Sequence, residues 1–314
     1  MTNASADPHE LVRLGRFAEA VPAFEQRYAQ ALSNFGEIYP ATLTAANDLG
    51  FAHIMAGQPM AAVGILARTL AGRRHISGER NRETLTVMVN LAQALIGADQ
   101  ATVAIEYLER ASHLCREVLG PADPMTLTAE NNLAETYVAT LRVAEGQTLH
   151  EHVLAVRSQI LGADHRDTLT SGHNLASAYE AGGDYPRAIE LLQETIASLE
   201  RALGPDHVDT LSTRNNLATL YHTAGRYPEA IALHERTWAD RERVLGEAHM
   251  HTLNSANNLA VAYFDAGRNN DGLAVFERAQ AICQGSLPPD HPTRRNFEAN
   301  LRAARETASG GSKR

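Results

Sequence analysis

The sequence predicts an all-α solenoid of stacked antiparallel helix pairs, because a 42-residue repeat runs through it and each repeat carries two helix-like apolar stripes. Thr-Leu follows six and seven residues after each of a set of evenly spaced glycines, as at Thr42-Leu43. These frame glycines are Gly36, Gly78, Gly120, Gly162, Gly204 and Gly246. Several positions keep one frame for more than 250 residues, and a fixed period of this kind indicates a repeat architecture.

The unit that begins at Leu203 illustrates how each period divides into a helix A and a helix B. Gly204 suits the left-handed residue that ends the preceding helix, and Asp209 places negative charge at the N-terminus of helix A. Gly225 separates the two helices, and Pro228 fits the first turn of helix B. The apolar stripes have helical spacing and comprise Leu211, Leu217, Ala218 and Tyr221 in helix A, then Ala230, Ile231, Leu233, Trp238 and Val244 in helix B.

Partial units are expected at both ends of a single solenoid domain that spans residues 8–307 and contains about six full repeats. Residues 14–20 match the A-to-B turn and the start of helix B, and residues 290–307 supply a lone, arginine-bearing helix A as a cap. Residues 1–7 and 308–314 are expected to be disordered. An irregular turn is expected at Leu141, which stands where other repeats have a turn glycine.

The composition fits helix packing and argues against nucleic acid as a partner. Hydrophobic residues make up 44% of the 314 residues but aromatic residues only 5%, and Ala and Leu dominate, which favours close helix–helix contacts over a sheet core. The 28 Lys and Arg against 37 Asp and Glu give a net charge of −9. General affinity for nucleic acid needs clustered positive charge, which this balance does not favour.

The cysteines and the N-terminus predict a cytoplasmic protein. Cys115 and Cys283 lie 168 residues apart, which is four periods, and this is too far for a disulfide within a solenoid. Both share a frame position late in helix B and are expected to be small buried apolar residues. The first residues resemble no signal peptide, and no apolar run is long enough to span a membrane.

One block of the unit carries a family resemblance. Asn216-Leu217-Ala218, Tyr221, Gly225-Arg226-Tyr227 and Ala230 resemble the tetratricopeptide repeat signature. The longer unit LGPDHxxTLxxxNNLAxxYxxAGRYxEAI is similar to the 42-residue variety of kinesin light chains and of many bacterial repeat proteins. The resemblance covers about residues 8–306 and implies a right-handed superhelix whose inner surface, formed by the A helices, binds peptides or proteins. The basic lining that kinesin light chains offer to acidic cargo is lacking here.

The candidate ligand contacts lie on helix A, at frame positions that are expected to face neither neighbouring helix. Position 12 after the frame glycine is asparagine in six of seven units, and position 11 adds further asparagines. A carboxamide both donates and accepts hydrogen bonds, so a row of them can follow an extended peptide backbone. The predicted peptide-binding residues of the concave groove are Asn47, Asn90, Asn131, Asn132, His173, Asn174, Arg214, Asn215, Asn216, His222, Asn257 and Asn258.

A structural role for these asparagines stays open beside the ligand role. An amide at a helix-pair contact can bond the neighbouring repeat and fix the stacking register, since buried polar groups need partners. The groove charge is expected to come from acidic and from basic or titratable side chains on helix A. The acidic ones are Glu130, Glu135, Glu180 and Asp265, and the basic or titratable ones are Arg214, His173 and His222. We expect a partner segment with apolar anchors and a basic residue.

No catalytic site, metal site or cofactor is expected. The sequence has no HExxH, CxxC, GxSxG or GxxxxGK[ST] motif, and nothing places a nucleophile beside a base. Four of the fourteen histidines share one frame position next to the start of helix A, which indicates capping of that helix or packing between repeats. They are His165, His207, His249 and His291.

These features favour a non-catalytic adaptor or scaffold that holds a protein or peptide segment in its groove, with no nucleic-acid or membrane partner. The alternative is a module that senses a ligand or a signal peptide and acts through a partner protein. A homo-oligomeric scaffold with contacts on the helix B surface is a third class, to which Tyr185, Tyr227 and Trp238 would contribute.

Overall fold

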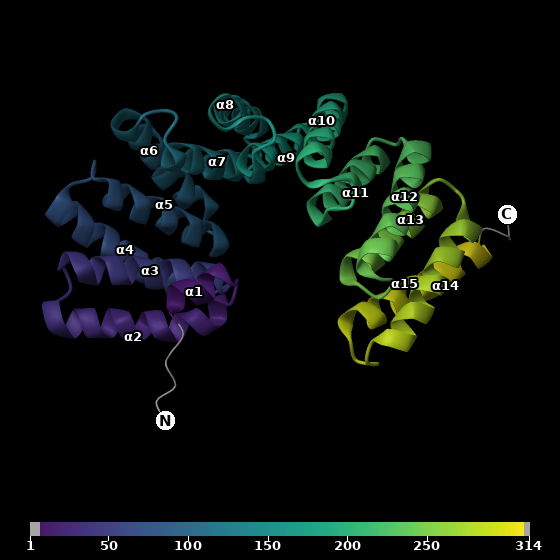
Figure 1. The fold of residues 1–314 in the computed structure, drawn as a ribbon, viewed down its shortest axis with the longest axis horizontal. Coiled ribbons are helices and arrows are strands. Elements are labelled where there is room, and N and C mark those ends of the chain that lie inside the picture. Colours follow the sequence, from purple (N-terminus) through teal and green to yellow (C-terminus); the bar gives the residue numbers. More distant parts are fainter. Residues whose placement is uncertain (1–6, 311–314) are drawn as a thin grey trace. The chain divides into compact units, whose positions relative to one another are not determined.

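The computed structural model describes residues 7–310, and within this range the chain is α-helical with no strand (Figure 1). The A helices of successive repeats are α3 (Pro40–Met55), α5 (Arg82–Gly97), α7 (Pro124–Ala139), α9 (Arg166–Ala181), α11 (Val208–Thr223), α13 (Met250–Asp265) and α15 (Pro292–Gly310). The B helices are α2 (Phe17–Phe35), α4 (Pro59–Ser77), α6 (Ala101–Leu119), α8 (Val143–Leu161), α10 (Tyr185–Leu203), α12 (Tyr227–Leu245) and α14 (Asn269–Ser286). A short α1 (Pro8–Arg13) precedes them. The predicted all-α stack of helix pairs is confirmed.

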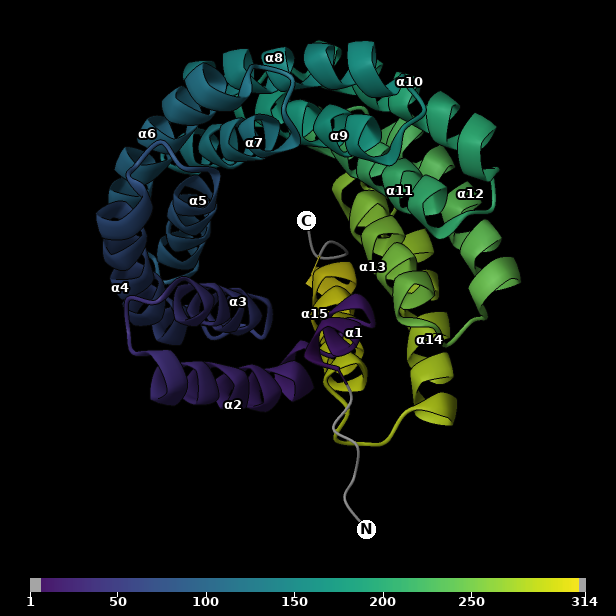
Figure 2. The same ribbon diagram turned by 60° about the vertical axis from the view of Figure 1, so that its left-hand side comes forward.

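The helices group into two compact units, Met1–Ile160 and Leu161–Arg314, called unit 1 and unit 2. Consecutive helices pack on one another from α1 to α7 in unit 1 and from α9 to α15 in unit 2, as α3 does on α4 and α11 on α12. The A helices also contact one another across repeats: α3 with α5, α5 with α7, and α11 with α13. Each unit is therefore a two-layer stack, with the A helices in one layer and the B helices in the other (Figure 2).

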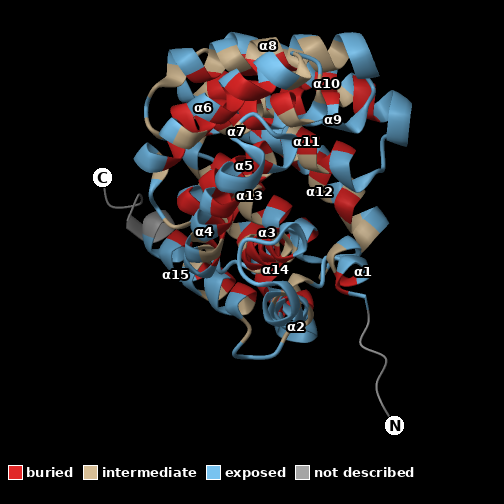
Figure 3. Ribbon diagram, turned by 90° about the vertical axis from the view of Figure 1, so that its left-hand side faces the viewer, coloured by how far each residue is buried: buried red, intermediate tan, exposed pale blue. Residues whose placement is uncertain are grey.

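Each layer is held by leucine and alanine side chains where helices meet. In unit 1 the largest cluster includes Leu66, Met88 and Leu108, all with no exposed surface. In unit 2 the corresponding cluster includes Leu259 and Phe276 and extends to α15. Buried segments accordingly lie on the faces between helices and exposed segments on the outer faces (Figure 3). Burial of apolar area of this kind is the main stabilising contribution to the stack.

The Thr-Leu signature joins the loop to the core. The leucine is buried, as Leu211 and Leu253 are. In three repeats the hydroxyl of the preceding threonine also bonds the carbonyl of the frame glycine. Thr210 Oγ1 donates to Gly204 O at 2.9 Å, and Thr252 Oγ1 donates to Gly246 O at 2.8 Å. The threonine thus satisfies a backbone carbonyl at the end of helix B that the helix itself leaves without a partner.

The turn at Leu141 is regular, so the expectation of an irregular turn was wrong. Leu141 takes the left-handed conformation with φ of 65°, and Gly183 and Gly225 at the same frame position have φ of 76° and 74°. Asp99 also adopts it, with φ of 60°. Because a side chain makes this conformation unfavourable by about 1–2 kcal/mol, the packing of the flanking helices must impose the turn at Leu141.

Helix A begins with a side-chain cap in most repeats. Asn81 Oδ1 and Asp123 Oδ1 each accept from the backbone N–H two residues later, both at 2.9 Å. In the later repeats the histidine Nδ1 takes this role, at 3.1–3.3 Å, in His165, His207, His249 and His291. The capping role predicted for the four histidines is therefore confirmed.

The ends of the fold differ slightly from the predicted bounds. Asp7, placed in the disordered N-terminal segment, caps α1 by accepting from His9 N at 3.3 Å. The last helix continues to Gly310, so residues 308–310 are helical and not part of a tail. The other residues predicted to be disordered, 1–6 and 311–314, lie outside the described range.

Both cysteines are buried and free, as expected. Burial raises the pKa of the Cys115 thiol to about 11, so this thiol is protonated and unreactive near neutral pH. Among residues 7–310, no helix is both long and apolar enough to cross a lipid bilayer.

Candidate functional site

The predicted asparagines pair across repeats on the A-helix layer. The amide at position 12 of one repeat donates to the side chain at position 11 of the repeat before it, 43 residues earlier. In unit 1, Asn90 Nδ2 donates to Asn47 Oδ1 at 2.9 Å. In unit 2, Asn258 Nδ2 donates to Asn215 Oδ1 at 3.4 Å. The two rows are therefore one ladder of bonded pairs.

The ladder in unit 2 extends in both directions from the Asn215–Asn258 pair. Asn300 Nδ2 donates to Asn257 Oδ1 at 2.9 Å, and Asn216 Nδ2 lies 3.4 Å from His173 Nε2. Burial lowers the pKa of His173, so its imidazole is neutral at pH 7 and can accept from the amide. Asn300 was not among the predicted site residues, although its frame position was known.

Asn131, Asn132 and Asn174 also lie on A helices but differ in their contacts. Asn131 Nδ2 donates to Glu135 Oε1 at 2.9 Å within α7. Asn132 has Val89 at position 11 of the preceding repeat, which offers no acceptor, and its amide bonds no other side chain in the described part of the chain. Asn174, on α9, is half-buried and has an interaction partner.

A second cross-repeat contact lies about two helical turns further along the A helices. His222 Nε2 and Asp265 Oδ2 are 2.7 Å apart, again at an offset of 43 residues. The histidine is at position 18 and the aspartate at position 19, so this pair has the same register as the asparagine pairs, seven residues on. Asp265 was also missed as a partner of His222, and the constant offset of 43 would have identified it.

Arg214 is placed differently from the prediction. Its side chain is only 3% exposed, and it bonds Glu200 Oε1 at 2.7 Å and Asp240 Oδ2 at 2.9 Å. Glu130 is likewise fully buried and bonds Arg116 on α6. Both stand at position 10, which faces the B helices and not the open side of helix A. Neither residue can therefore supply the groove charge that the sequence suggested.

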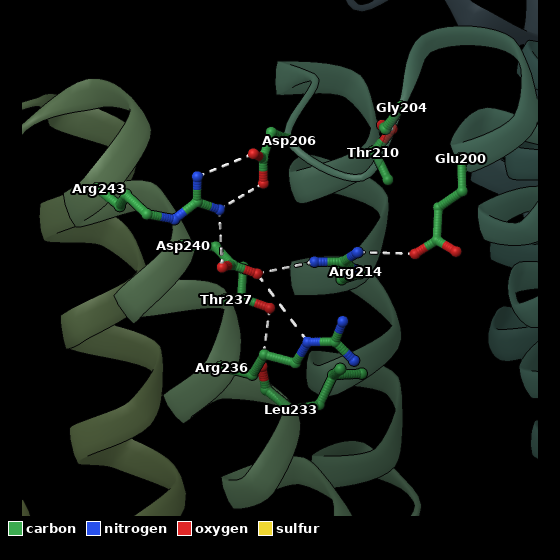
Figure 4. A network of polar contacts seen from close by, with 10 residues as sticks. All are labelled: Glu200, Gly204, Asp206, Thr210, Arg214, Leu233, Arg236, Thr237, Asp240 and Arg243. Atoms are coloured by element: carbon green, nitrogen blue, oxygen red, sulfur yellow. Dashed lines mark hydrogen bonds and ion pairs between the residues drawn. The ribbon is translucent and has the colours of Figure 1, made fainter.

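The Arg214 contacts belong to a larger ion-pair network between α10, α11 and α12 (Figure 4). Asp240 also contacts Arg243 at 3.1 Å, and Arg243 contacts Asp206 in the preceding loop at 2.5 Å. Arg243 lowers the pKa of the Asp206 carboxyl through a hydrogen bond. The network links one helix A, two B helices and a loop of unit 2, which is a structural role.

The site has the chemistry of a hydrogen-bonding surface. In the Asn257–Asn300 pair, the cross-repeat bond uses one N–H of Asn300 and one lone pair of Asn257. A carboxamide has two N–H donors and two lone pairs, so both residues keep donors and acceptors for a further molecule. Both are half-buried. No group of three or more His, Cys, Asp or Glu side chains in the described residues is arranged to hold a metal ion.

Comparisons with known proteins identify the repeat. Family models described as tetratricopeptide repeat match residues 83–144, 126–201 and 173–243, and residues 42–83 and 252–293. A crystal structure from Podosopora anserina, described as kinesin light chain-like with nearly identical TPR-like repeats, is 30% identical, with 65% of this chain and 97% of that chain covered and a TM-score of 0.60. No curated protein gave a match.

More distant structures share the fold alone. BtubC (BKLC) from P. vanneervenii is 19% identical, with 86% of this chain and 95% of that chain covered and a TM-score of 0.55. The apo form of RapI is 11% identical, with 89% and 97% covered and a TM-score of 0.59. The family models cover most of the sequence in one continuous frame with the helix pairs described above. The chain belongs to the tetratricopeptide repeat family.

Proposed function

We propose that the protein is a non-catalytic adaptor that holds an extended segment of a partner protein along its A-helix layer. Tetratricopeptide repeats are protein-interaction modules, and the A-helix layer is where this chain repeats the same polar side chains. The single observation that carries the proposal is the ladder of amide pairs, in which Asn257, Asn258 and Asn300 keep hydrogen-bonding groups beyond those used between repeats.

An extended backbone suits this surface because it presents alternating N–H and C=O groups with no demand on sequence. The amides are held in place by their neighbours, which reduces the entropy lost when a ligand binds. The layer also carries apolar groups at its edge, such as Ile96, which is 37% exposed. We therefore expect main-chain contacts to the ladder and apolar side-chain contacts beside it. We expect the protein to act in the cytoplasm, where free cysteines such as Cys115 and Cys283 stay reduced.

The test compares two sets of substitutions in capture experiments with the full chain as bait. Asn216→Ala and Asn257→Ala remove amides from the ladder, and Glu106→Ala with Glu194→Ala changes exposed residues of the B helices as a matched control. Partners identified by mass spectrometry should fall at least tenfold with the ladder variant and stay unchanged with the control. Equal capture by both variants, at unchanged helicity by circular dichroism, would contradict the proposal.

The second candidate function is a module that senses a small ligand. A cavity of about 510 Å³ between α9, α10 and α11 supports it, since its size falls within the range of ligand pockets. Recovery of a small molecule or short peptide with the purified protein, in place of a stoichiometric protein partner, would favour this candidate.

A further inference from the structure

Buried arginines at one frame position hold neighbouring repeats together. Position 37, late in helix B, is Arg73 in α4, and its guanidinium is nearly inaccessible, with 4% of the side chain exposed. Arg73 Nη2 donates to Thr44 Oγ1 at 2.6 Å and to Pro40 O at 3.2 Å, both on α3. Its Nη1 bonds the Glu83 carboxylate of the next repeat. The guanidinium thus fills the space between two A helices.

Arg241 fills the equivalent space in unit 2. Its Nη1 donates to Ser255 Oγ at 2.7 Å and to His251 O at 3.0 Å, both in the following repeat. Its Nη2 donates to Ser212 Oγ at 3.2 Å, at the frame position that Thr44 has in unit 1. The oxygen atoms that accept from these two arginines, the acceptor set, therefore follow one pattern. One is a hydroxyl at position 8 of the arginine's own repeat, and others stand at position 5 or 9 of the next repeat.

Leu199 stands at position 37 of the repeat formed by α9 and α10, and it lines the 510 Å³ cavity. Thr170, at position 8, and Asp209 and Thr213, at positions 5 and 9 of the next repeat, line the same cavity. This is the arginine-binding acceptor set of the sibling repeats, with a leucine in place of the arginine. Leucine is shorter than arginine and has no donor, so it leaves these oxygens without a guanidinium.

The three remaining members of position 37 differ. Arg157 in α8 is again an arginine and is half-buried. Cys115 and Cys283 are each followed, at position 9 of the next repeat, by a residue with no hydroxyl, Ala129 and Phe297. Leucine is the residue at position 37 only in the α10 repeat, and there the next repeat retains both Asp209 and Thr213. An acceptor set without its own arginine is therefore a particular property of this junction.

We propose that this cavity binds a guanidinium group, supplied by an arginine side chain of the partner segment. Hydroxyl and carboxylate oxygens from two walls suit the planar, five-donor fork of arginine better than the point charge of lysine. Asp209 is exposed at the cavity rim and provides the counter-charge. Asp164, also in the lining, already pairs with Arg201 at 2.8 Å, and the exposed Arg166 side chain adds one positive charge to the rim.

The cavity lies beside the candidate site. His173 and Asn216, which form one pair of the ladder, are among its lining residues. An arginine that entered the cavity would therefore extend from a segment lying on the ladder of unit 2. In this respect the inference rests on the proposed function, but binding of an isolated arginine side chain does not, and it can be tested alone.

The experiment titrates the full-length protein with N-acetyl-arginine amide and with N-acetyl-lysine amide, followed by NMR of the Leu199 and Thr170 methyl groups. We expect saturable shifts with the arginine compound and at least tenfold weaker binding of the lysine compound. Asp209→Asn should weaken arginine binding at least tenfold. Equal binding of both compounds, or no saturable shift, would overturn the inference.

Two substitutions at Leu199 complete the test. Leu199→Arg should supply the guanidinium internally, abolish binding of the arginine compound and leave the melting temperature equal or higher, whereas Leu199→Met should bind as the wild type does. Unfolding of Leu199→Arg would also overturn the inference, because the acceptors would then not match an arginine. The Asn216→Ala and Asn257→Ala capture result reports on the ladder separately, so each proposal can fail without the other.

Discussion

Two buried histidines should make the stability of this protein depend on pH in mildly acidic solution. His150 in α8 and His234 in α12 are each 1% exposed and stand at frame position 30, where three of the other four repeats have leucine, as at Leu66 and Leu108. The Nδ1 atoms of both histidines have no hydrogen-bond partner among the described residues. Burial lowers the pKa of each imidazole from 6.5 to about 4.

The direction in which stability changes with pH follows from which state of the protein binds the protons. Above pH 6.5 both states of the protein hold a neutral imidazole, and stability is unaffected. Between pH 6.5 and about 4 the unfolded chain binds a proton that the folded chain excludes, so stability falls as the pH falls. Each histidine should cost about 1.4 kcal/mol at pH 5.5 relative to pH 7.5, and about 3 kcal/mol once both states are protonated.

The perturbation is His150→Leu combined with His234→Leu, which copies the sibling repeats. The two substitutions should remove about 3 kcal/mol of acid sensitivity between pH 7.5 and 5.5, and should stabilise the protein at pH 7.5 because two unpaired buried ring nitrogens are lost. Urea unfolding at both pH values measures this, with exposed His113→Leu as the control. Parallel loss of stability in the wild type and the double variant would refute the reasoning.

Two further predictions concern positions where one repeat departs from the others. Leu141→Gly should stabilise the protein by about 0.5–1 kcal/mol, because it relieves the left-handed conformation of a leucine at some cost in chain entropy. Leu141→Ala keeps the Cβ atom and should bring no gain. Thermal melting of both variants measures the difference. Arg214→Met should cost about 2–3 kcal/mol in urea unfolding, because it leaves Asp240 and Glu200 without their buried partner; an unchanged midpoint would mean that the network contributes nothing.

The sequence was sufficient for the fold because the repeat makes each local signal occur several times. The frame glycines, the Thr-Leu pair and the capping histidines all lie where the 42-residue period places them, and each has a local cause that one repeat alone would suggest. Even the turn at Leu141 keeps the geometry of its siblings. There the neighbouring helices outweigh the preference of a single residue, which a local signal cannot reveal.

The candidate site was less predictable because its contacts cross from one repeat to the next. The stagger between stacked A helices brings position 12 of one repeat against position 11 of the repeat before it. The 42-residue period alone does not determine this stagger. The prediction that Arg214 lines the groove was wrong for a related reason. Position 10 is next to positions 11 and 12 in sequence, but it lies on the other side of the helix, against the B layer. Charge and polarity do not distinguish the two sides.

The amide pairs impose a condition on how a ligand can bind. A neutral hydrogen bond between side chains contributes about 1 kcal/mol net, so a ligand that broke the Asn257–Asn300 bond would have to replace it before gaining affinity. A ligand that uses the remaining N–H groups and lone pairs loses nothing between repeats. Binding is therefore most favourable for a segment that lies along the pairs without separating them, which is the geometry of an extended backbone following the stack from one repeat to the next.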